Sequence, residues 1–138
     1  MASFCPRIGV CGDGSPLAEA LCAALLAGAV SGSAAGVWLD PTFPACASFA
    51  IQLYGLSCAV HISAKDGEAE LRLYNAHGVP FGEKMKKKLS DAVRRNDRPR
   101  RANAFGRIRR LSGTEESYTA ALRALSPLSG LTVCVTGQ

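Results

Sequence analysis

The sequence predicts an α/β domain in which a mixed β-sheet is flanked by layers of helices. Short apolar runs of strand length alternate with helical patterns along the 138 residues, an order that is typical of layered α/β folds. The run Cys58–Ile62 is almost continuously apolar, as expected for a strand that is buried on both faces of a sheet. A chain of this length suits one domain with its own core.

The first strand and helix are predicted from a turn followed by a capping signal. Residues 7–11 are a short strand candidate, and residues 12–14, Gly-Asp-Gly, are a turn. Ser15 is a suitable N-cap, and Pro16 suits the first helical position. The helix is therefore expected to run to about Gly28. The residues expected to face the core are Leu17, Leu21, Ala24 and Leu25.

A strand and a second helix are expected before the central run Cys58–Ile62, and another strand is expected after it. Residues 36–39 are apolar and short enough for a strand, and residues 43–53 form a helix after Asp-Pro-Thr. Gly55 closes this helix in the manner of a C-terminal glycine. After the central run, residues 69–74 alternate apolar and polar side chains, which predicts a strand with one solvated face.

The C-terminal part predicts a helix over residues 83–95. Met85, Leu89 and Val93 recur at the spacing of one helical face, so they are expected to form its buried stripe, with the lysines outside. The remaining predicted elements are an arginine-rich loop at 96–103, an extended segment at 106–111, a helix at 115–125 and a last strand at 131–135.

The composition is that of a folded globular protein, with 48% hydrophobic and 20% charged residues. Six cysteines are scattered without a C-x-x-C pair, which predicts reduced, mostly buried thiols in a cytoplasmic protein and argues against zinc or a disulfide framework. The start of the chain lacks the pattern of a secretory signal. The Ala/Leu run at 20–30 is shorter than a span of about 20 residues, so no membrane association is expected.

The net charge of +5 is concentrated in one segment. Residues 84–110 contain 12 Lys and Arg against two Asp, a local charge of +10, and the other residues carry 4 against 9, a charge of −5. Such a segment could contact the phosphates of a nucleic acid. It contains one aromatic residue, Phe105, and therefore no stacking platform; a solvated helix face is the alternative. The candidate residues are Lys86, Lys87, Arg94, Arg95, Arg98, Arg100 and Arg101.

The segment Ile62-Ser63-Ala64-Lys65-Asp66-Gly67-Glu68 carries a resemblance to a known family. With its surroundings it resembles the first domain of the alpha-D-phosphohexomutases, which include phosphoglucomutase and phosphomannomutase. There the stretch reads roughly I-T/S-A-S-H-N-P and holds the serine that is phosphorylated. Lys65 stands at the place of that serine and Asp66 at the place of the histidine. The resemblance therefore implies a degenerate serine loop, formed by Ser63, Ala64, Lys65 and Asp66, and no catalytic residue.

The match extends in order along most of the chain. Val10–Glu19 is similar to the family's V-G-R-D-T-R-x-S-x-E and keeps Asp13 and Glu19, but both arginines are replaced. The other matching segments are 41–45 with V-P-T-P-A, 71–78 with G-I-K-V-Y/F-x-x-x-G, and 106–111 together with Tyr118 with the G-x-V-x-R segment and its helix.

The resemblance also implies boundaries. Residues 1–128 correspond to the first domain without its N-terminal strand and helix, and residues 129–138 resemble the first strand of the second domain. The family's D-G-D-x-D-R loop for Mg²⁺, its sugar-selecting loop and its phosphate-binding domain have no counterpart in the sequence. We therefore expect no cofactor, no metal site and no tight binding of a sugar phosphate.

Three other features have weaker interpretations. Lys65 lies in an acidic turn, where it should stay protonated and be a poor nucleophile. Gly12, Gly14 and Ser15 at a helix start are candidates for binding an anion, although a turn with an N-cap explains the same residues. His61 and His77 lack metal-ligand spacing and are expected to be structural.

Three functional hypotheses follow. The first is a non-catalytic phosphohexomutase-like domain in carbohydrate metabolism that acts as a binding or interaction module. The second is a fragment or subunit of a split phosphohexomutase, which would pair with a partner chain or a second copy through the strand Leu131–Val135. The third is a protein that binds polyanions or nucleic acid through residues 84–110.

Overall fold

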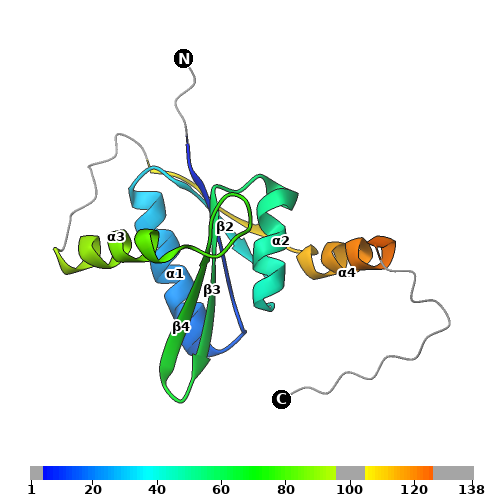
Figure 1. Ribbon diagram of the computed structural model, residues 1–138, viewed down its shortest axis with the longest axis horizontal. Helices are drawn as coiled ribbons and strands as arrows, with labels where there is room; N and C mark the ends of the chain where they lie inside the picture. The colour runs from blue at the N-terminus through cyan, green and yellow to red at the C-terminus, as the bar shows by residue number, and fades with distance from the viewer. Residues whose placement is uncertain (1–4, 96–104, 126–138) are drawn as a thin grey trace.

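A five-stranded mixed sheet forms the centre of the computed structural model, which describes residues 5–95 and 105–125 (Figure 1). The strands are β1 (Arg7–Gly12), β2 (Ala35–Leu39), β3 (Cys58–Lys65), β4 (Glu68–Tyr74) and β5 (Ile108–Leu111). Their spatial order is β4-β3-β1-β2-β5, with β4 antiparallel to β3 and the other neighbours parallel. The predicted α/β class with a mixed sheet is confirmed.

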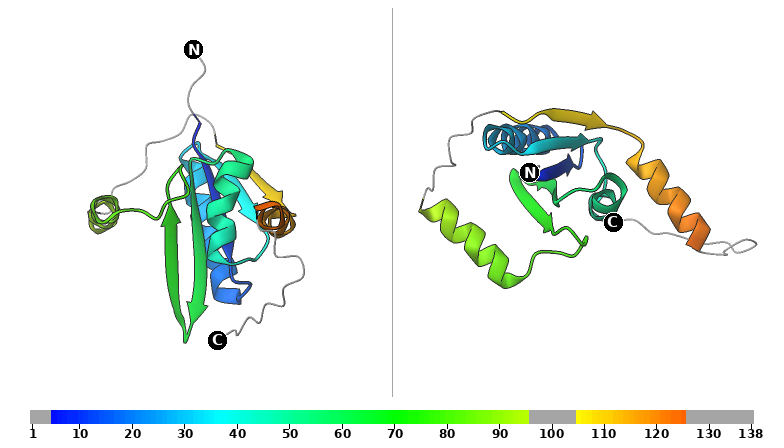
Figure 2. Two further views of the ribbon diagram at one scale, coloured as in Figure 1. Left: turned by 45° about the vertical axis from the view of Figure 1, so that its right-hand side comes forward. Right: turned by 90° about the horizontal axis from the view of Figure 1, so that it is seen from above.

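Four helices flank this sheet in the described part of the chain: α1 (Pro16–Ser31), α2 (Pro44–Tyr54), α3 (Glu83–Arg94) and α4 (Thr114–Leu125). The two buried clusters show that α1 and α2 cover opposite faces (Figure 2). On β1, Val10 packs into the cluster that contains α1, and the next residue, Cys11, packs into the cluster that contains α2. This alternation follows from the two-residue period of a strand.

The buried face of α1 differs from the predicted one. Ala18, Cys22 and Leu26 are buried, whereas Leu17 and Ala24 are exposed and Leu21 and Leu25 are half-buried. The helix is apolar on nearly every side, so hydrophobic spacing alone does not select its face. Close packing selects it instead, because a Cβ at Gly12 would lie only 3.1 Å from Cβ of Ala18. Small side chains therefore face the sheet where the helix approaches it.

The apolar stripe predicted for α3 is also not buried. Met85, Leu89 and Val93 are 50%, 45% and 73% exposed, and no residue of α3 is buried. The sequence pattern correctly predicts a helix with one apolar face, but none of the described elements covers that face. Figures 1 and 2 show α3 standing away from the sheet.

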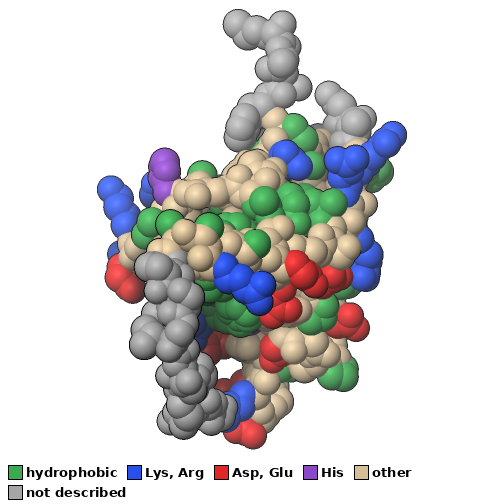
Figure 3. Space-filling model, turned by 90° about the vertical axis from the view of Figure 1, so that its right-hand side faces the viewer, with side chains coloured by type: hydrophobic (Ala, Val, Ile, Leu, Met, Phe, Trp, Pro, Cys, Tyr) green, Lys and Arg blue, Asp and Glu red, His purple; other side chains and the backbone are tan. Residues whose placement is uncertain are grey.

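The helix α4 packs against α2 through a small group of aromatic contacts. Tyr118 makes edge-to-face contacts with Phe43 and Phe49, with ring centroids 5.4 and 5.5 Å apart. The hydroxyl groups of Tyr54 and Thr114 are hydrogen-bonded at 3.0 Å. The face seen in Figure 3, at the α4 end of the molecule, carries hydrophobic side chains next to Asp and Glu side chains.

Several predictions concern residues outside the described ranges. These are the loop at 96–103, the strand Leu131–Val135, the boundary at 128 and 129, and the side chains of Arg98, Arg100, Arg101 and Cys134. The other five cysteines are free thiols. Burial raises the pKa of Cys11 to about 12 and that of Cys22 to about 11. Within the described ranges, no helix combines the length and the apolar character that crossing a membrane requires.

The contrast between α1 and α3 predicts opposite results for two leucine substitutions. Leu26 is fully buried, so Leu26→Ala should lower the free energy of unfolding by about 2–5 kcal/mol. Leu89 lies on the stripe that is exposed in the single chain, so in the monomer Leu89→Ala should change it by less than about 0.5 kcal/mol. Urea unfolding followed by circular dichroism measures both values. Equal losses would show that α3 packs against the rest of the domain.

Candidate functional site

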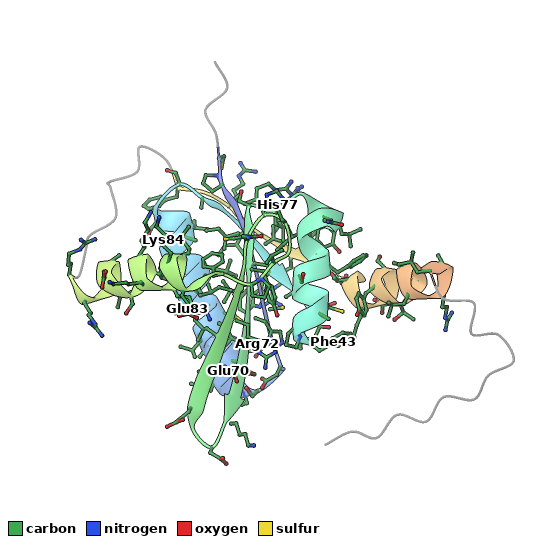
Figure 4. The ribbon with its side chains drawn as sticks, viewed as in Figure 1. Phe43, Glu70, Arg72, His77, Glu83 and Lys84 are labelled. Atoms are coloured by element: carbon green, nitrogen blue, oxygen red, sulfur yellow. The ribbon has the colours of Figure 1, made fainter. Side chains whose placement is uncertain are left out.

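A cavity of about 470 Å³ lies at the C-terminal edge of the parallel strands β1 and β3. Figure 4 shows two of its residues, Arg72 from β4 and Phe43 from the start of α2, on the same side of the molecule. The residues that line the cavity are Asp13, Pro41, Thr42, Phe43, Pro44, His61, Ser63, Arg72 and Glu115. Its volume is in the range of small-molecule sites, about 300–1,000 Å³.

The strand order explains why the cavity forms at this edge. The chain leaves β1 toward α1 on one face of the sheet and leaves β2 toward α2 on the other face. The next strand, β3, then pairs with the free side of β1. Ligands of open parallel sheets bind where such connections diverge, outside the carboxyl ends of the strands. The cavity is at this position.

Three loops are joined at the cavity by backbone hydrogen bonds. The Thr42 amide donates to the Gly12 carbonyl at 2.9 Å, and the Asp13 amide donates to the Ile62 carbonyl at 3.1 Å. His61 Nε2 lies 2.7 Å from the Thr42 carbonyl oxygen. These bonds connect the ends of β1 and β3 with the segment before α2, so the cavity wall is fixed by the sheet.

His61 is buried in that wall, with 2% of its surface exposed. A carbonyl oxygen only accepts hydrogen bonds, so the contact with Thr42 assigns the proton to Nε2. In the neutral imidazole Nδ1 would then be an acceptor, and it has no hydrogen-bond partner within the described residues. The prediction that His61 is structural agrees with the Nε2 bond but does not account for Nδ1.

Asp13 ties the loop after β1 to the end of β3. Its Oδ1 accepts a hydrogen bond from the Ser15 amide and its Oδ2 accepts one from the Ala64 amide, both at 2.9 Å. The Ser15 hydroxyl, then the two amides, lower the pKa of Asp13 to about 2. The carboxylate therefore stays ionised and serves as a connection between two loops.

The four positions predicted to be a degenerate serine loop belong to a β-hairpin. β3 continues to Lys65, which pairs with Glu68, and the turn consists of Asp66 and Gly67 only. Both turn residues have positive φ, 54° and 79°, as a type I′ turn requires. Lys65 is exposed at the tip. The side chains of Ser63 and Lys65 lie on the same face of β3, and Ala64 lies on the other.

This register brings Arg72 and Glu70 to the cavity side of the sheet. His61 pairs with Arg72, and Ser63 pairs with Glu70. Arg72 Nε lies 3.3 Å from Glu70 Oε1 in an exposed ion pair, so the guanidinium charge is largely balanced. Asp13 and Glu115 also line the cavity, so the charged side chains around it have a net negative charge. This charge disfavours an anionic ligand.

The candidate anion-binding residues Gly12, Gly14 and Ser15 do lie together at the start of α1. Ser15 caps the helix, since its Oγ accepts a hydrogen bond from the Ala18 amide at 3.3 Å. The Ser15 amide is already bonded to the Asp13 carboxylate. The chain therefore supplies its own anion at this helix start, and binding of an external anion stays a prediction.

The candidate polyanion-binding residues that the structure describes do not line the cavity. Lys86, Lys87, Arg94 and Arg95 lie on α3 or at its end, and α3 is at the end of the molecule opposite α4 (Figure 1). On β5, the Arg110 guanidinium lies 4.1 Å from the ring centroid of Trp38, a cation–π contact. No group of three or more metal-ligating side chains occurs within residues 5–95 and 105–125.

Sequence reasoning did not single out six residues of the cavity wall as site residues: Pro41, Thr42, Phe43, Pro44, Arg72 and Glu115. The position of Arg72 could be predicted from the sequence, because Asp-Gly flanked by strands indicates a two-residue hairpin turn. That turn pairs residue 65 with 68 and hence 61 with 72. Glu115 reaches the cavity only through the packing of α4 on α2, which no local pattern indicates.

Comparison with protein-family models found no match for this chain. Comparison with curated proteins found no match either. The resemblance to the phosphohexomutases therefore stays a prediction from the sequence.

Asp13 predicts a defined loss of stability in acid. Its folded-state pKa is below the ordinary value of 3.8, so its stabilising effect is complete above about pH 4 and is lost as the pH falls toward 2. Asp13→Asn should lower the free energy of unfolding at pH 7 by about 1 kcal/mol, because it removes one charged acceptor. Urea unfolding should show this difference shrinking from pH 4 to pH 2. A difference that is independent of pH would contradict the role of the carboxylate.

Proposed function

We propose that this chain is a non-catalytic phosphohexomutase-like domain that acts as a binding module for a small hydroxyl-rich ligand. The observation that carries the proposal is the cavity beside β1 and β3, which is built on the edge of the sheet and has no activated nucleophile among its described lining residues. Residue 65 is a lysine at an exposed hairpin tip. The hydroxyl closest in sequence to residue 65 is that of Ser63. It has no hydrogen bond to the His61 imidazole, whose Nδ1 has no partner among the described residues.

The cavity chemistry supports a hydroxyl-rich ligand over an anionic one. Pro41, Phe43 and Pro44 supply an apolar wall, while Asp13 and Glu115 supply carboxylate acceptors for hydroxyl groups. Their negative charge opposes a phosphate group. A sugar fits these features better than a sugar phosphate. The proposal also includes a cytoplasmic location, a role in carbohydrate metabolism and the absence of a cofactor or metal.

The first test asks whether the chain can be phosphorylated. After incubation with glucose 1,6-bisphosphate and Mg²⁺, the intact mass should stay unchanged, because no hydroxyl occupies the position of the family's phosphoserine. An active phosphoglucomutase treated in parallel is the positive control. A phosphoryl adduct that tandem mass spectrometry places between residues 63 and 66 would contradict the proposal.

The second test asks whether the cavity binds a sugar. Titration with glucose should shift the amide resonances of Asp13, Ser63 and Arg72 in a saturable way, and glucose 1-phosphate should bind less tightly. Ser63→Leu should fill the cavity and abolish the shifts. Ala64→Leu, on the opposite face of the same strand, is the matched control and should preserve them. Absence of saturable shifts in the unchanged protein would refute the ligand class.

A second candidate function, binding of a polyanion, is favoured by the exposure of the α3 lysines. Lys84, Lys86, Lys87 and Lys88 are all exposed, and one ion pair, between Lys86 and Glu83 at 3.8 Å, is present among the described α3 lysines. Affinity for nucleic acid that falls steeply with salt would be its signature.

The hypothesis of a split phosphohexomutase depends on Leu131–Val135, which lies outside the described residues. It remains a prediction from the sequence.

A further inference from the structure

We propose that two copies of this chain form a dimer in which α3 of each copy docks on the α4 surface of the other. This inference does not depend on the ligand of the cavity. It starts from α3, whose apolar stripe of Met85, Leu89 and Val93 is exposed among lysines. A helix with such a stripe is stable in a protein when a partner covers it.

The stripe is bordered by basic side chains on both sides. At 100° per residue, Met85, Leu89 and Val93 span about 80° of the helix circumference, with Lys86 at one border and Lys88 at the other. Lys84 and Lys87 point away from the stripe. A surface that covers the stripe must therefore combine an apolar centre with acidic groups beside it.

The α4 surface has this combination. A depression of about 420 Å³ is lined by Phe43, Glu115, Glu116, Thr119, Ala120 and Arg123. Phe43 is 41% exposed, and Leu122 on the same helix is 48% exposed, so apolar area is available. Glu115 and Glu116 lie in the first turn of α4 and Arg123 lies in its last turn. A parallel approach of α3 would bring its first turns, with Lys86 and Lys88, to the two glutamates.

The position of the two helices allows this contact to be made twice. α3 and α4 lie at opposite ends of the long axis of the molecule (Figure 1). Two copies placed side by side in opposite directions bring α3 of each onto α4 of the other, which closes a twofold-symmetric dimer. α3 carries five basic and two acidic side chains, a charge of +3, and α4 carries two acidic and one basic, a charge of −1. This difference makes both contacts attractive.

Other occupants explain less of the surface. Pairing of α3 with α3 would bring two basic surfaces together, which is unfavourable. Nucleic acid would neutralise the lysines but would leave the apolar stripe uncovered. An anionic lipid surface could accept both the lysines and the stripe, but it would leave the acidic and apolar α4 surface unused.

Sedimentation of the full chain at low salt should give a particle of twice 14.4 kDa, and salt should dissociate it. Lys86→Glu with Lys88→Glu should weaken dimerisation by about tenfold or more, because like charges then meet Glu115 and Glu116. Lys84→Glu with Lys87→Glu changes the charge equally on the far side of α3 and should leave the dimer intact. Circular dichroism checks that each variant is folded.

A charge exchange gives the decisive result. Glu115→Lys with Glu116→Lys should also give a monomer. A mixture of this variant with the Lys86→Glu, Lys88→Glu variant restores both contacts and should form a heterodimer. A monomeric wild type, or a mixture that stays monomeric, overturns the proposal. Binding of anionic phosphatidylserine vesicles or duplex DNA through α3 by a chain that stays monomeric would overturn it as well.

Discussion

The two-residue turn at Asp66 and Gly67 is the constraint on which the candidate site depends. It joins β3 and β4 with Lys65 opposite Glu68, and every cross-strand pair of the hairpin follows from that register. His61 is thereby placed opposite Arg72 and Ser63 opposite Glu70 on the α2 side of the sheet. A shift of one residue would move all of these side chains to the other face. The cavity exists in its present form because this turn is short and has positive φ at both positions.

The same turn sets the position of Lys65, on which the proposed absence of catalysis depends. Phosphoryl transfer depends on a nucleophile, a metal ion and a precise placement of the substrate. At this edge of the sheet, the segment that resembles a phosphoserine loop is extended strand with an exposed lysine at its end. Asp13 is used to hold two loops together, and His61 is held by the Thr42 carbonyl. These interactions fix the geometry of a binding site, and that is why we propose binding without catalysis.

In the proposed dimer, the exposed surfaces of α3 and α4 at the two ends of the molecule form a second functional region. The sheet edges and the cores around α1 and α2 leave α3 and α4 with exposed apolar side chains, and the charges beside them have opposite sign. The cavity at the sheet edge and the depression beside α4 share two lining residues, Phe43 and Glu115. Through these two residues, association at α4 and binding in the cavity can influence each other.

The sequence by itself determined the class of the fold, the order of its elements and the helical amphipathicity of residues 83–94, because these depend on local periodicity, caps and turns. Ser15 and Gly55 cap their helices as expected. The tertiary structure alone decided which face of α1 is buried, since an almost wholly apolar helix is oriented by close contacts such as that of Gly12 with Ala18. It also decided that the stripe of α3 is exposed and that Glu115 joins the cavity. Both depend on how distant elements pack, and the local pattern of residues contains no information on that packing.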